Sequence, residues 1–237
     1  VEEAGPVRGV LRMTWRFRDS TLTQRVTVYA HTPRIDFVTE VDWQERQVLL
    51  KVAFPVYVRT TRATYDIQFG SVERPTHWNT SWDWARFEVP AQKWADLSEG
   101  DYGVALLNDC KYGYDVRDNV MRLTLIKSAI RPDALADKGR HVFTYSLLPH
   151  AGDWRVGDVA AEAYDLNLPL RAVQQPANST GSLPPSFSFV SCDAPNVVIE
   201  TIKKSEDDDA WIVRIYENCQ SRGPVRLNFG RPVRRAV

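Results

Sequence analysis

Apolar and polar residues alternate along several stretches of the chain with a period of two. Residues 11–18 alternate four apolar side chains with arginine and threonine: Leu11, Met13, Trp15 and Phe17. This pattern predicts a half-buried β-strand, because successive side chains point to opposite faces of a sheet. The same alternation recurs in three later stretches: 22–30, 35–43 and 62–69.

Shorter apolar stretches predict further strands at 47–58, 84–89, 102–108, 120–127, 141–148, 196–203, 210–217 and 225–229. Many short strands with polar outer faces are typical of antiparallel sheets stacked as a sandwich. Helical spacing occurs once, in residues 153–166, although Gly157 weakens its first turn. The predicted fold is mostly β: a large antiparallel β-sandwich with one short helix and a small additional β segment at the C-terminus.

The composition changes between residues 167 and 186, where proline, glutamine, glycine, serine and threonine predominate. Such a stretch is typical of an irregular connection. We therefore expect a large β-sandwich at 1–166, a linker at 167–186, and strands of a second, smaller β-sandwich at 187–237.

Charge and hydropathy narrow the range of partners. The 237 residues include 30 Lys and Arg and 30 Asp and Glu, so the net charge is zero, whereas nucleic-acid binding usually shows a basic surplus. No apolar run approaches the ~20 residues needed to cross a bilayer. We expect neither a nucleic-acid nor a membrane partner, and a homo-oligomer remains open. Three cysteines form no paired framework, and no secretory signal is visible, so the expected location is cytoplasmic.

Local signatures of catalysis are absent from the sequence. The four histidines lie far apart and outside the spacings typical of zinc ligands. The sequence also contains no GxSxG elbow, GxGxxG loop or phosphate-binding loop. We therefore expect no catalytic residue, no metal ligand and no cofactor within this chain.

Residues 74–84 contain three tryptophans among histidine, asparagine, threonine, serine and aspartate. Aromatic rings beside polar side chains suit a sugar, whose C–H groups pack on the ring while its hydroxyls form hydrogen bonds. The alternative is that the indoles fill the end of the core, because tryptophan is usually buried. Trp84 is expected in the core, since a predicted strand starts there, which leaves Trp78 and Trp82 as candidates for substrate binding.

A second candidate segment, residues 102–115, runs from an apolar strand into a polar turn with two tyrosines. Amide, carboxylate and aromatic groups at a strand end could read sugar hydroxyls. The alternative is an ordinary turn whose tyrosines pack over the sheet edge. Cys110 has no identified basic neighbour and is interpreted as a bystander rather than a nucleophile.

These two segments lie within stretches that resemble the C-terminal β region of glycoside hydrolase family 38, the α-mannosidases. The resemblance covers nearly the whole chain, including EAYDLNLPL (162–170), and its main stretches are VDWQERQVLLKVAFPV (41–56), ATYDIQFGSVERPTHWNTSWDWARFEVPAQKWADLSE (63–99), YGVALLNDCKYGYDVRDNVMRLTLIKS (102–128) and HVFTYSLLPHAGDW (141–154). The turn beginning at Asn108 is most similar to the bacterial and cytosolic branch. Golgi and lysosomal relatives tend to carry arginine where this chain has Cys110, so a role for that arginine does not transfer.

The resemblance implies a multidomain retaining exo-α-mannosidase, with a catalytic α/β domain and a helical bundle before large β-sandwich domains of the galactose-mutarotase-like type. It places the zinc ligands and the nucleophilic aspartate in the upstream domains. The expected role of this chain is then a non-catalytic C-terminal β domain, inactive alone, whose partners are its own upstream catalytic domain and a mannoside or oligosaccharide substrate. The resemblance further implies that five residues shape the sugar pocket or the domain interface: Asn108, Asp109, Lys111, Tyr112 and Tyr114.

Two other functions remain open from the sequence. A stand-alone mutarotase-like sugar epimerase would need a general acid and base, for which His77 and His141 are the candidates. These two imidazoles would have to line one open cleft together with a carboxylate. A carbohydrate-binding or domain-assembly module would instead be favoured if Trp78 and Trp82 were exposed on one face.

Overall fold

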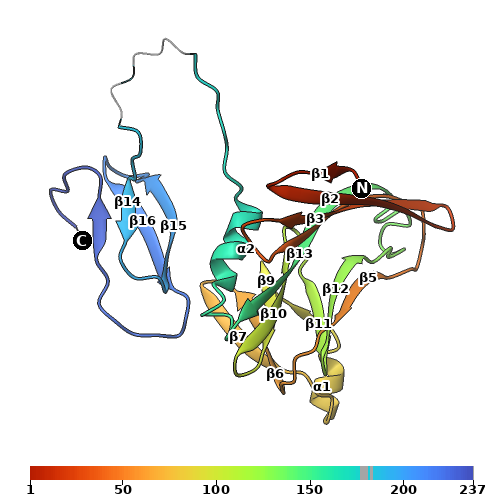
Figure 1. Ribbon diagram of the computed structural model, residues 1–237. Coiled ribbons are helices and arrows are strands. Elements are labelled where there is room, and N and C mark those ends of the chain that lie inside the picture. Colours follow the sequence, from red (N-terminus) through yellow and green to blue (C-terminus); the bar gives the residue numbers. More distant parts are fainter. Residues whose placement is uncertain (177–180, 182–183, 237) are drawn as a thin grey trace. The chain divides into compact units, whose positions relative to one another are not determined.

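The computed structural model describes residues 1–176, 181 and 184–236. The chain divides into two compact units (Figure 1), of which the larger comprises Val1–Gln68 and Val72–Pro169. The smaller unit comprises Phe69–Ser71 and the chain from Leu170 onward. Both candidate segments lie in the larger unit, and the domain borders expected at 166 and 187 stay predictions.

The larger unit is built on a long antiparallel sheet. Within the described part of the chain this sheet has nine strands in the spatial order β1 (Glu3–Ala4), β2 (Arg8–Phe17), β3 (Ser20–Tyr29), β4 (Ile35–Trp43), β13 (Gly139–Ala151), β10 (Tyr102–Asn108), β9 (Trp94–Ser98), β6 (Arg62–Ile67) and β7 (Gly70–Pro75). The alternating stretches of the sequence account for β2, β3, β4 and β6, as predicted. The mostly β, antiparallel fold class is therefore confirmed.

A smaller sheet packs on one face of the long sheet. Its described strands follow the order β5 (Leu50–Pro55), β12 (Val120–Ile126), β11 (Gly113–Arg117) and β8 (Val89–Pro90). Between the two sheets lies a continuous apolar core that includes Tyr65, Leu106, Leu123 and Phe143, all at most 2% exposed. Burial of such side chains contributes about 1.5–3 kcal/mol each, so this core holds the two sheets together.

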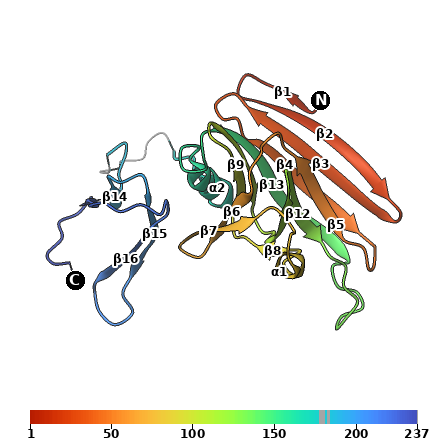
Figure 2. The ribbon, with the colours of Figure 1, turned by 90° about the horizontal axis from the view of Figure 1, so that it is seen from below.

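The opposite face of the long sheet is covered by helix α2 (Val159–Asn167), which packs on β9 and β10 (Figure 2). Val159 and Ala163 face the sheet and are fully buried. The helix begins later than the predicted 153–166. A Cβ on Gly157 would lie 2.4 Å from His150 Nδ1, so a glycine is needed where the chain passes this imidazole.

His150 and Asp96 form a buried ion pair beside α2. His150 Nε2 lies 2.7 Å from Asp96 Oδ2, both side chains are at most 3% exposed, and Ser98 donates a hydrogen bond to the other carboxylate oxygen. Burial acts to lower the pKa of His150, but the hydrogen bond and charge of Asp96 outweigh it, so this pKa is raised above 6.5. For Asp96, burial acts in the opposite direction and raises the pKa of its carboxyl group.

We expect the stability of the folded chain to fall as pH rises through the raised pKa of His150. The folded state keeps its proton above pH 6.5, where unfolded histidine loses it, so the stabilisation is complete below the unfolded pKa and disappears at higher pH. Urea unfolding followed from about pH 6 to about pH 9 measures this decline. His150→Gln should flatten the profile, while His31→Gln, an exposed control, should not; equal profiles for all three proteins would contradict the assignment.

The smaller unit contains two antiparallel strand pairs among its described residues. Strand β14 (Val190–Cys192) pairs with β17 (Leu227–Phe229), and β15 (Val197–Lys204) pairs with β16 (Trp211–Glu217). These strands agree with the additional β segment expected at the C-terminus. Residues 177–180, within the expected linker, lie outside the described residues.

Three expectations require correction. The predicted strand at 84–89 is replaced by helix α1 (Ser81–Ala85) and the short β8, so the described chain has two helices instead of one. Strand β11 begins inside the stretch interpreted as a turn. The apolar side of β2 is not buried: Trp15 and Phe17 are 44% and 47% exposed, because the small sheet does not extend far enough to cover them.

Candidate functional site

The tryptophan-rich segment folds around helix α1. Thr80 caps this helix: its side chain accepts a hydrogen bond from the backbone N–H of Asp83, and the Asp83 carboxylate accepts one from the backbone N–H of Thr80. This reciprocal capping box compensates two backbone groups at the helix start. The pattern Thr80-x-x-Asp83 is the sequence signal that would have predicted α1 in place of a strand.

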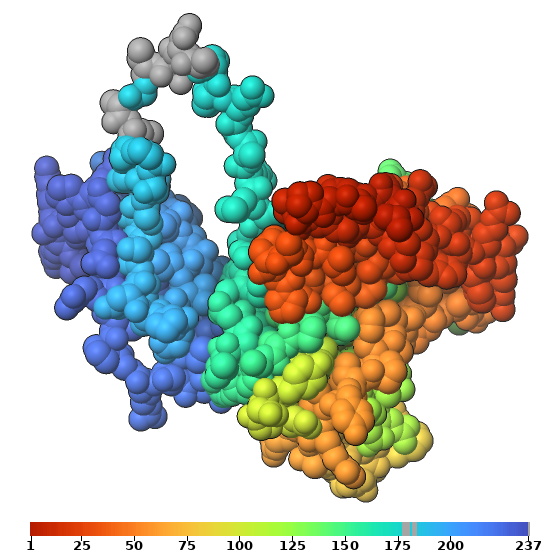
Figure 3. Space-filling model, viewed as in Figure 1, coloured from red at the N-terminus to blue at the C-terminus, as the bar shows by residue number. Residues whose placement is uncertain are grey.

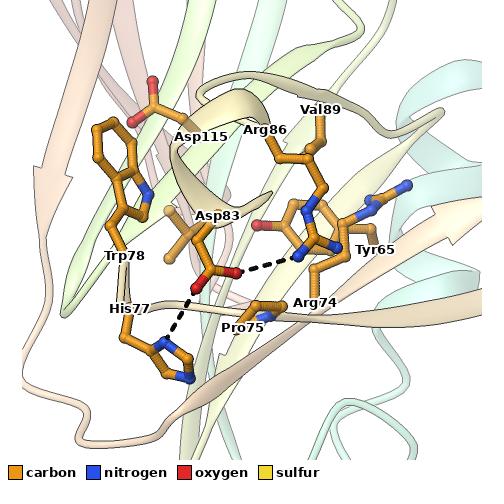
Figure 4. A pocket seen from close by; sticks show the side chains of 10 residues that line it. Tyr65, Arg74, Pro75, His77, Trp78, Asp83, Arg86, Val89 and Asp115 are labelled. Carbon is orange, nitrogen blue, oxygen red and sulfur yellow. Dashed lines mark hydrogen bonds and ion pairs between the residues drawn. The ribbon is translucent and has the colours of Figure 1, made fainter. Parts of the chain in front are cut away.

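Asp83 organises the surrounding loop (Figure 4). Its buried carboxylate accepts hydrogen bonds from Asn79 and Thr80, lies 3.0 Å from Arg86 Nη2, and lies 3.7 Å from His77 Nδ1. Burial acts to raise the pKa of Asp83, but the hydrogen bonds from Thr80 and Asn79 outweigh it and lower this pKa. The carboxylate therefore remains charged near neutral pH and holds the loop together.

We expect Thr80→Ala to lower the free energy of unfolding by about 1 kcal/mol, because the N-terminal cap of α1 is lost. Ser81→Ala is the matched control, since it removes a neighbouring exposed hydroxyl while leaving the capping box intact. Urea unfolding of the two variants measures the difference. Equal stabilities would show that the capping box does not hold this loop.

Arginine side chains pack against aromatic rings beside α1. The guanidinium of Arg117 lies 4.5 Å from the Trp78 ring centroid, and that of Arg74 lies 4.6 Å from the Tyr65 ring centroid. Burial lowers the pKa of Arg74, and its Nη1 donates no hydrogen bond to any described residue. These cation–π contacts position Trp78 and close the inner side of the loop.

The pocket enclosed by these side chains is small. It is lined by residues of α1, its flanking loops and strands β6, β7, β8 and β11, and has a volume of about 20 Å³. This volume is enough for about one water molecule and far below the ~300 Å³ of ordinary ligand sites. A sugar ring does not fit inside, so any sugar contact by this segment must be made on its outer surface.

The three tryptophans differ in exposure. Trp82 and Trp84 are 79% and 63% exposed on α1, whereas Trp78 is half-buried, with its ring centroid 5.3 Å from that of Trp84. The expectation that Trp84 belongs to the core is therefore wrong, because a helix rather than a strand carries it. Trp82 presents the most accessible aromatic surface of the segment.

The polar turn between β10 and β11 has a buried base formed by Asn108 and Tyr114, both 0% exposed. Asn108 Nδ2 donates hydrogen bonds to the Gln92 carbonyl (2.8 Å) and the Tyr114 hydroxyl (2.7 Å), and its Oδ1 accepts one from the Lys111 backbone N–H (2.6 Å). The Tyr114 hydroxyl donates to the Leu106 carbonyl. These groups are used within the protein, so both residues support the turn rather than present themselves to solvent.

The remaining residues of the turn lie nearer the surface. Asp109 Oδ2 accepts a hydrogen bond from the Thr144 backbone N–H, while its Oδ1 has no partner among the described residues. The Lys111 ammonium lies 4.6 Å from the Phe143 ring centroid, and Tyr112 is 58% exposed. Burial, together with the neighbouring Asp109 carboxylate, raises the pKa of Cys110 to about 11, so this thiol is mostly protonated near neutral pH.

Strand β8 links the two candidate segments. It follows the α1 loop and pairs with β11 at Gly113 and Tyr114, and Ala91 N–H donates to the Tyr112 carbonyl. Gly113 lets the strand pass close to Glu88, since a Cβ would lie 2.3 Å from a carboxylate oxygen of that side chain, which would have to move aside. The α1 loop and the polar turn are therefore coupled through one short strand.

Several residues of this region were not identified from the sequence. Arg86 follows the tryptophan segment and carries no sequence signal of its contact with Asp83, and Arg117 comes from a strand 39 residues after Trp78. Asp115 forms ion pairs with Lys51 and Arg122 on the outer face of the small sheet. These contacts depend on which strands pair and in which register. The sequence pattern does not show this pairing.

Metal ligands and the proposed acid–base pair were also compared with the structure. The described part of the chain contains no group of three or more His, Cys, Asp and Glu side chains that could hold a metal ion. His77 borders the α1 pocket, whereas His141, bonded to the Asp137 carbonyl, is not among the described residues that line it. None of the described helices is long and apolar enough to cross a membrane.

Comparison with known families and proteins defines what this β region is. Residues 1–135 match the family described as glycosyl hydrolases family 38 C-terminal domain, and residues 196–237 match the glycosyl hydrolases family 38 C-terminal beta sandwich domain. Both matches describe β regions of glycosidases. The chain belongs to glycosyl hydrolase family 38 and corresponds to its C-terminal region.

Curated relatives show how much of a longer protein the chain represents. It is 46% identical to human Alpha-mannosidase 2C1 over 222 residues, covering 92% of this chain and 21% of that protein. It is 42% identical to Alpha-mannosidase G of Dictyostelium discoideum, covering 96% of this chain and 21% of that protein. The chain therefore spans about one fifth of these relatives.

A solved structure shares the fold. An alpha-mannosidase from Enterococcus faecalis V583 superposes with a TM-score of 0.79 at 21% identity, covering 89% of this chain and 25% of the other. This similarity supports the sandwich architecture described above.

Proposed function

We propose that residues 1–237 form a non-catalytic C-terminal β region of a retaining α-mannosidase. The observation that carries this proposal is the pair of family 38 C-terminal matches together with the 21% coverage of the α-mannosidase relatives. In this proposal the region scaffolds an upstream catalytic domain of the same chain. The zinc ion and the nucleophile are proposed for that upstream part, as the resemblance to family 38 implies.

The exposed residues of the two coupled segments are the proposed sugar contacts. Tyr112 and Trp82 offer accessible aromatic faces, and the partly buried Lys111 and Asp109 place charged groups in the same turn as Tyr112. Trp78 packs on the Trp84 ring and so supports the aromatic surface of α1. Asn108 and Tyr114 shape the turn through their hydrogen bonds. The substrate class is a mannoside or oligosaccharide, and the proposed location is the cytoplasm, which suits three cysteines that are free.

The identity of the whole enzyme is tested by its choice of glycoside. The full-length chain is expected to hydrolyse an aryl α-mannoside and to spare the corresponding β-mannoside and α-glucoside. Polarimetry with mannose measures the epimerase alternative, which no contact between described residues favours. Absence of α-mannoside hydrolysis, or mutarotation without hydrolysis, would contradict the proposal.

A contact at the turn is tested with Tyr112→Ala in the full-length chain. Loss of a sugar-packing ring is expected to raise KM for the α-mannoside by about ten-fold, equivalent to about 1.4 kcal/mol of binding. Tyr57→Ala is the matched control, since Tyr57 is a 98% exposed tyrosine outside both segments. An unchanged KM for Tyr112→Ala in a normally folded protein would remove this residue from the proposed sugar site.

A further inference from the structure

One apolar surface of the larger unit is uncovered although it continues the face that forms the core. Trp15 on β2 lies opposite Leu22 on β3, and Leu22 lies opposite the fully buried Val41 on β4. These three residues therefore share one face of the long sheet. Trp15 and Phe17 are nevertheless 44% and 47% exposed, and Figure 3 shows the N-terminal strands at the surface, projecting past the orange strands beneath them.

The uncovered face borders a groove of about 440 Å³. One wall consists of side chains from β2, β3 and β4, including Trp15, Phe17 and Trp43. The Phe17 and Trp43 rings stack, with their centroids 6.3 Å apart. The other wall includes residues 48–52, which lead into and form the start of β5. Most of the lining is apolar, and exposed aromatic rings in such a groove are typical of a surface that another protein segment covers.

Strand β5 is also an incomplete edge. It ends the small sheet and, within the described chain, pairs only with β12. The small sheet has four described strands facing a sheet of nine, so it stops where the apolar face of β2 and β3 begins. An edge strand beside an uncovered apolar face is arranged to accept a further strand, which would bond to β5 and bury the exposed rings.

The polar groups of the groove do not favour a sugar as the occupant. Gln24 Nε2 donates to the Thr39 hydroxyl and the Tyr145 hydroxyl, and Ser20 donates to Glu45. Lys51 is engaged by Glu88 and Asp115. A sugar needs free groups to read its hydroxyls, whereas a β-strand needs apolar walls and a backbone edge, and the groove provides both.

We propose that a β-strand from the part of the full-length chain that precedes residue 1 adds to β5 and covers Trp15 and Phe17. This inference rests on the proposed function, under which the chain is the C-terminal region of a longer mannosidase. About four fifths of the length of the related mannosidases lies outside the matched region, so a segment of the same chain is available as the occupant. A strand held in the same chain is present at high effective concentration and keeps the rings permanently covered.

The test places a photoreactive benzoylphenylalanine at position 15 of the full-length chain. The matched control places it at position 16, where Arg16 points from the opposite face of the same strand. Isotopically light and heavy proteins are mixed before irradiation, and cross-linked peptides are identified by mass spectrometry. We expect the probe at position 15 to cross-link to a peptide upstream of residue 1 within the same molecule. The probe at position 16 should not form this cross-link.

Other outcomes overturn the proposal. A mixed light–heavy cross-link would assign the groove to a second copy of the chain, and loss of the cross-link on adding mannose oligosaccharides would assign it to sugar. If the substituted proteins do not fold, hydrogen exchange of residues 50–55 in the unmodified full-length chain decides: protection matching that of the central strand β10 supports the added strand, and rapid exchange rejects it. Hydrolysis of an α-mannoside by the unmodified protein is measured separately, so failure of the proposed function is distinguished from failure of this inference.

Discussion

Asn108→Ala is expected to lower the free energy of unfolding by about 3 kcal/mol. The substitution removes three hydrogen bonds, to the Gln92 carbonyl, the Tyr114 hydroxyl and the Lys111 backbone, from a site that is fully buried. Each buried group left without its partner costs about 1–3 kcal/mol, and relaxation of the turn recovers part of the sum. Urea unfolding of the chain measures the loss.

The control for this prediction comes from the same turn. Tyr112→Ala removes a larger side chain, but that side chain is 58% exposed, so stability should change by no more than about 0.5 kcal/mol. If the two substitutions had equal effects on unfolding, Asn108 would not be the buried support of the turn. A large loss for Asn108→Ala alone would instead explain any loss of activity at this position through folding.

Trp94→Ala should have the largest effect on stability, about 4 kcal/mol. The Trp94 side chain is 1% exposed on β9, and its ring centroid lies 5.1 Å from that of Trp154, close to where α2 covers the sheet. Truncating a buried aromatic side chain leaves a cavity, which typically costs 3–5 kcal/mol. We expect α2 to lose protection from hydrogen exchange before the rest of the larger unit, because its packing surface is removed.

Trp82→Ala is the matched control, because it makes the same chemical change at a residue that is 79% exposed. Its stability should remain within about 0.5 kcal/mol of the unmodified chain. The pair therefore separates structural from surface tryptophans in one experiment. A loss for Trp82→Ala as large as that for Trp94→Ala would show that Trp82 is not free to contact a sugar.

The fold could be predicted where strands have one buried and one polar face. The alternation of apolar and polar residues predicts strands β2, β3 and β4, because each strand carries polar or charged side chains on one face. Strand β9 does not, since four of its five residues are buried and Asp96 occupies an interior position with His150. A strand covered on both faces loses the period of two, and a buried ion pair looks like a surface charge in the sequence.

The candidate site could be located as two segments but not resolved into individual roles. The sequence pattern places Trp84 in a strand and in the core, whereas the structure places it with Trp82 on α1, where both rings are exposed. Asn108 and Tyr114 look like ligands because they are polar, yet in the structure they bond to each other and to the Gln92 and Leu106 carbonyls. Whether a polar side chain is satisfied inside the protein depends on tertiary packing.

The exposed face of β2 shows a different limit. Alternation correctly predicts that Trp15 and Phe17 share the apolar side of their strand, but no described residue covers this side fully. The alternation shows that the apolar face of β2 should be buried. The strand that covers this face can lie in another part of a longer protein. For this reason the uncovered face is where we propose that a strand from the preceding part of the chain adds.

The central claim is that these residues form architecture beside a catalytic domain that lies elsewhere in the full-length chain. The most direct measurement is hydrolysis of an aryl α-mannoside by residues 1–237 alone, folded as judged by circular dichroism, with added zinc and with a metal chelator. We predict no turnover under either condition, alongside hydrolysis by the full-length chain. Turnover by residues 1–237 that persists through purification would contradict the claim.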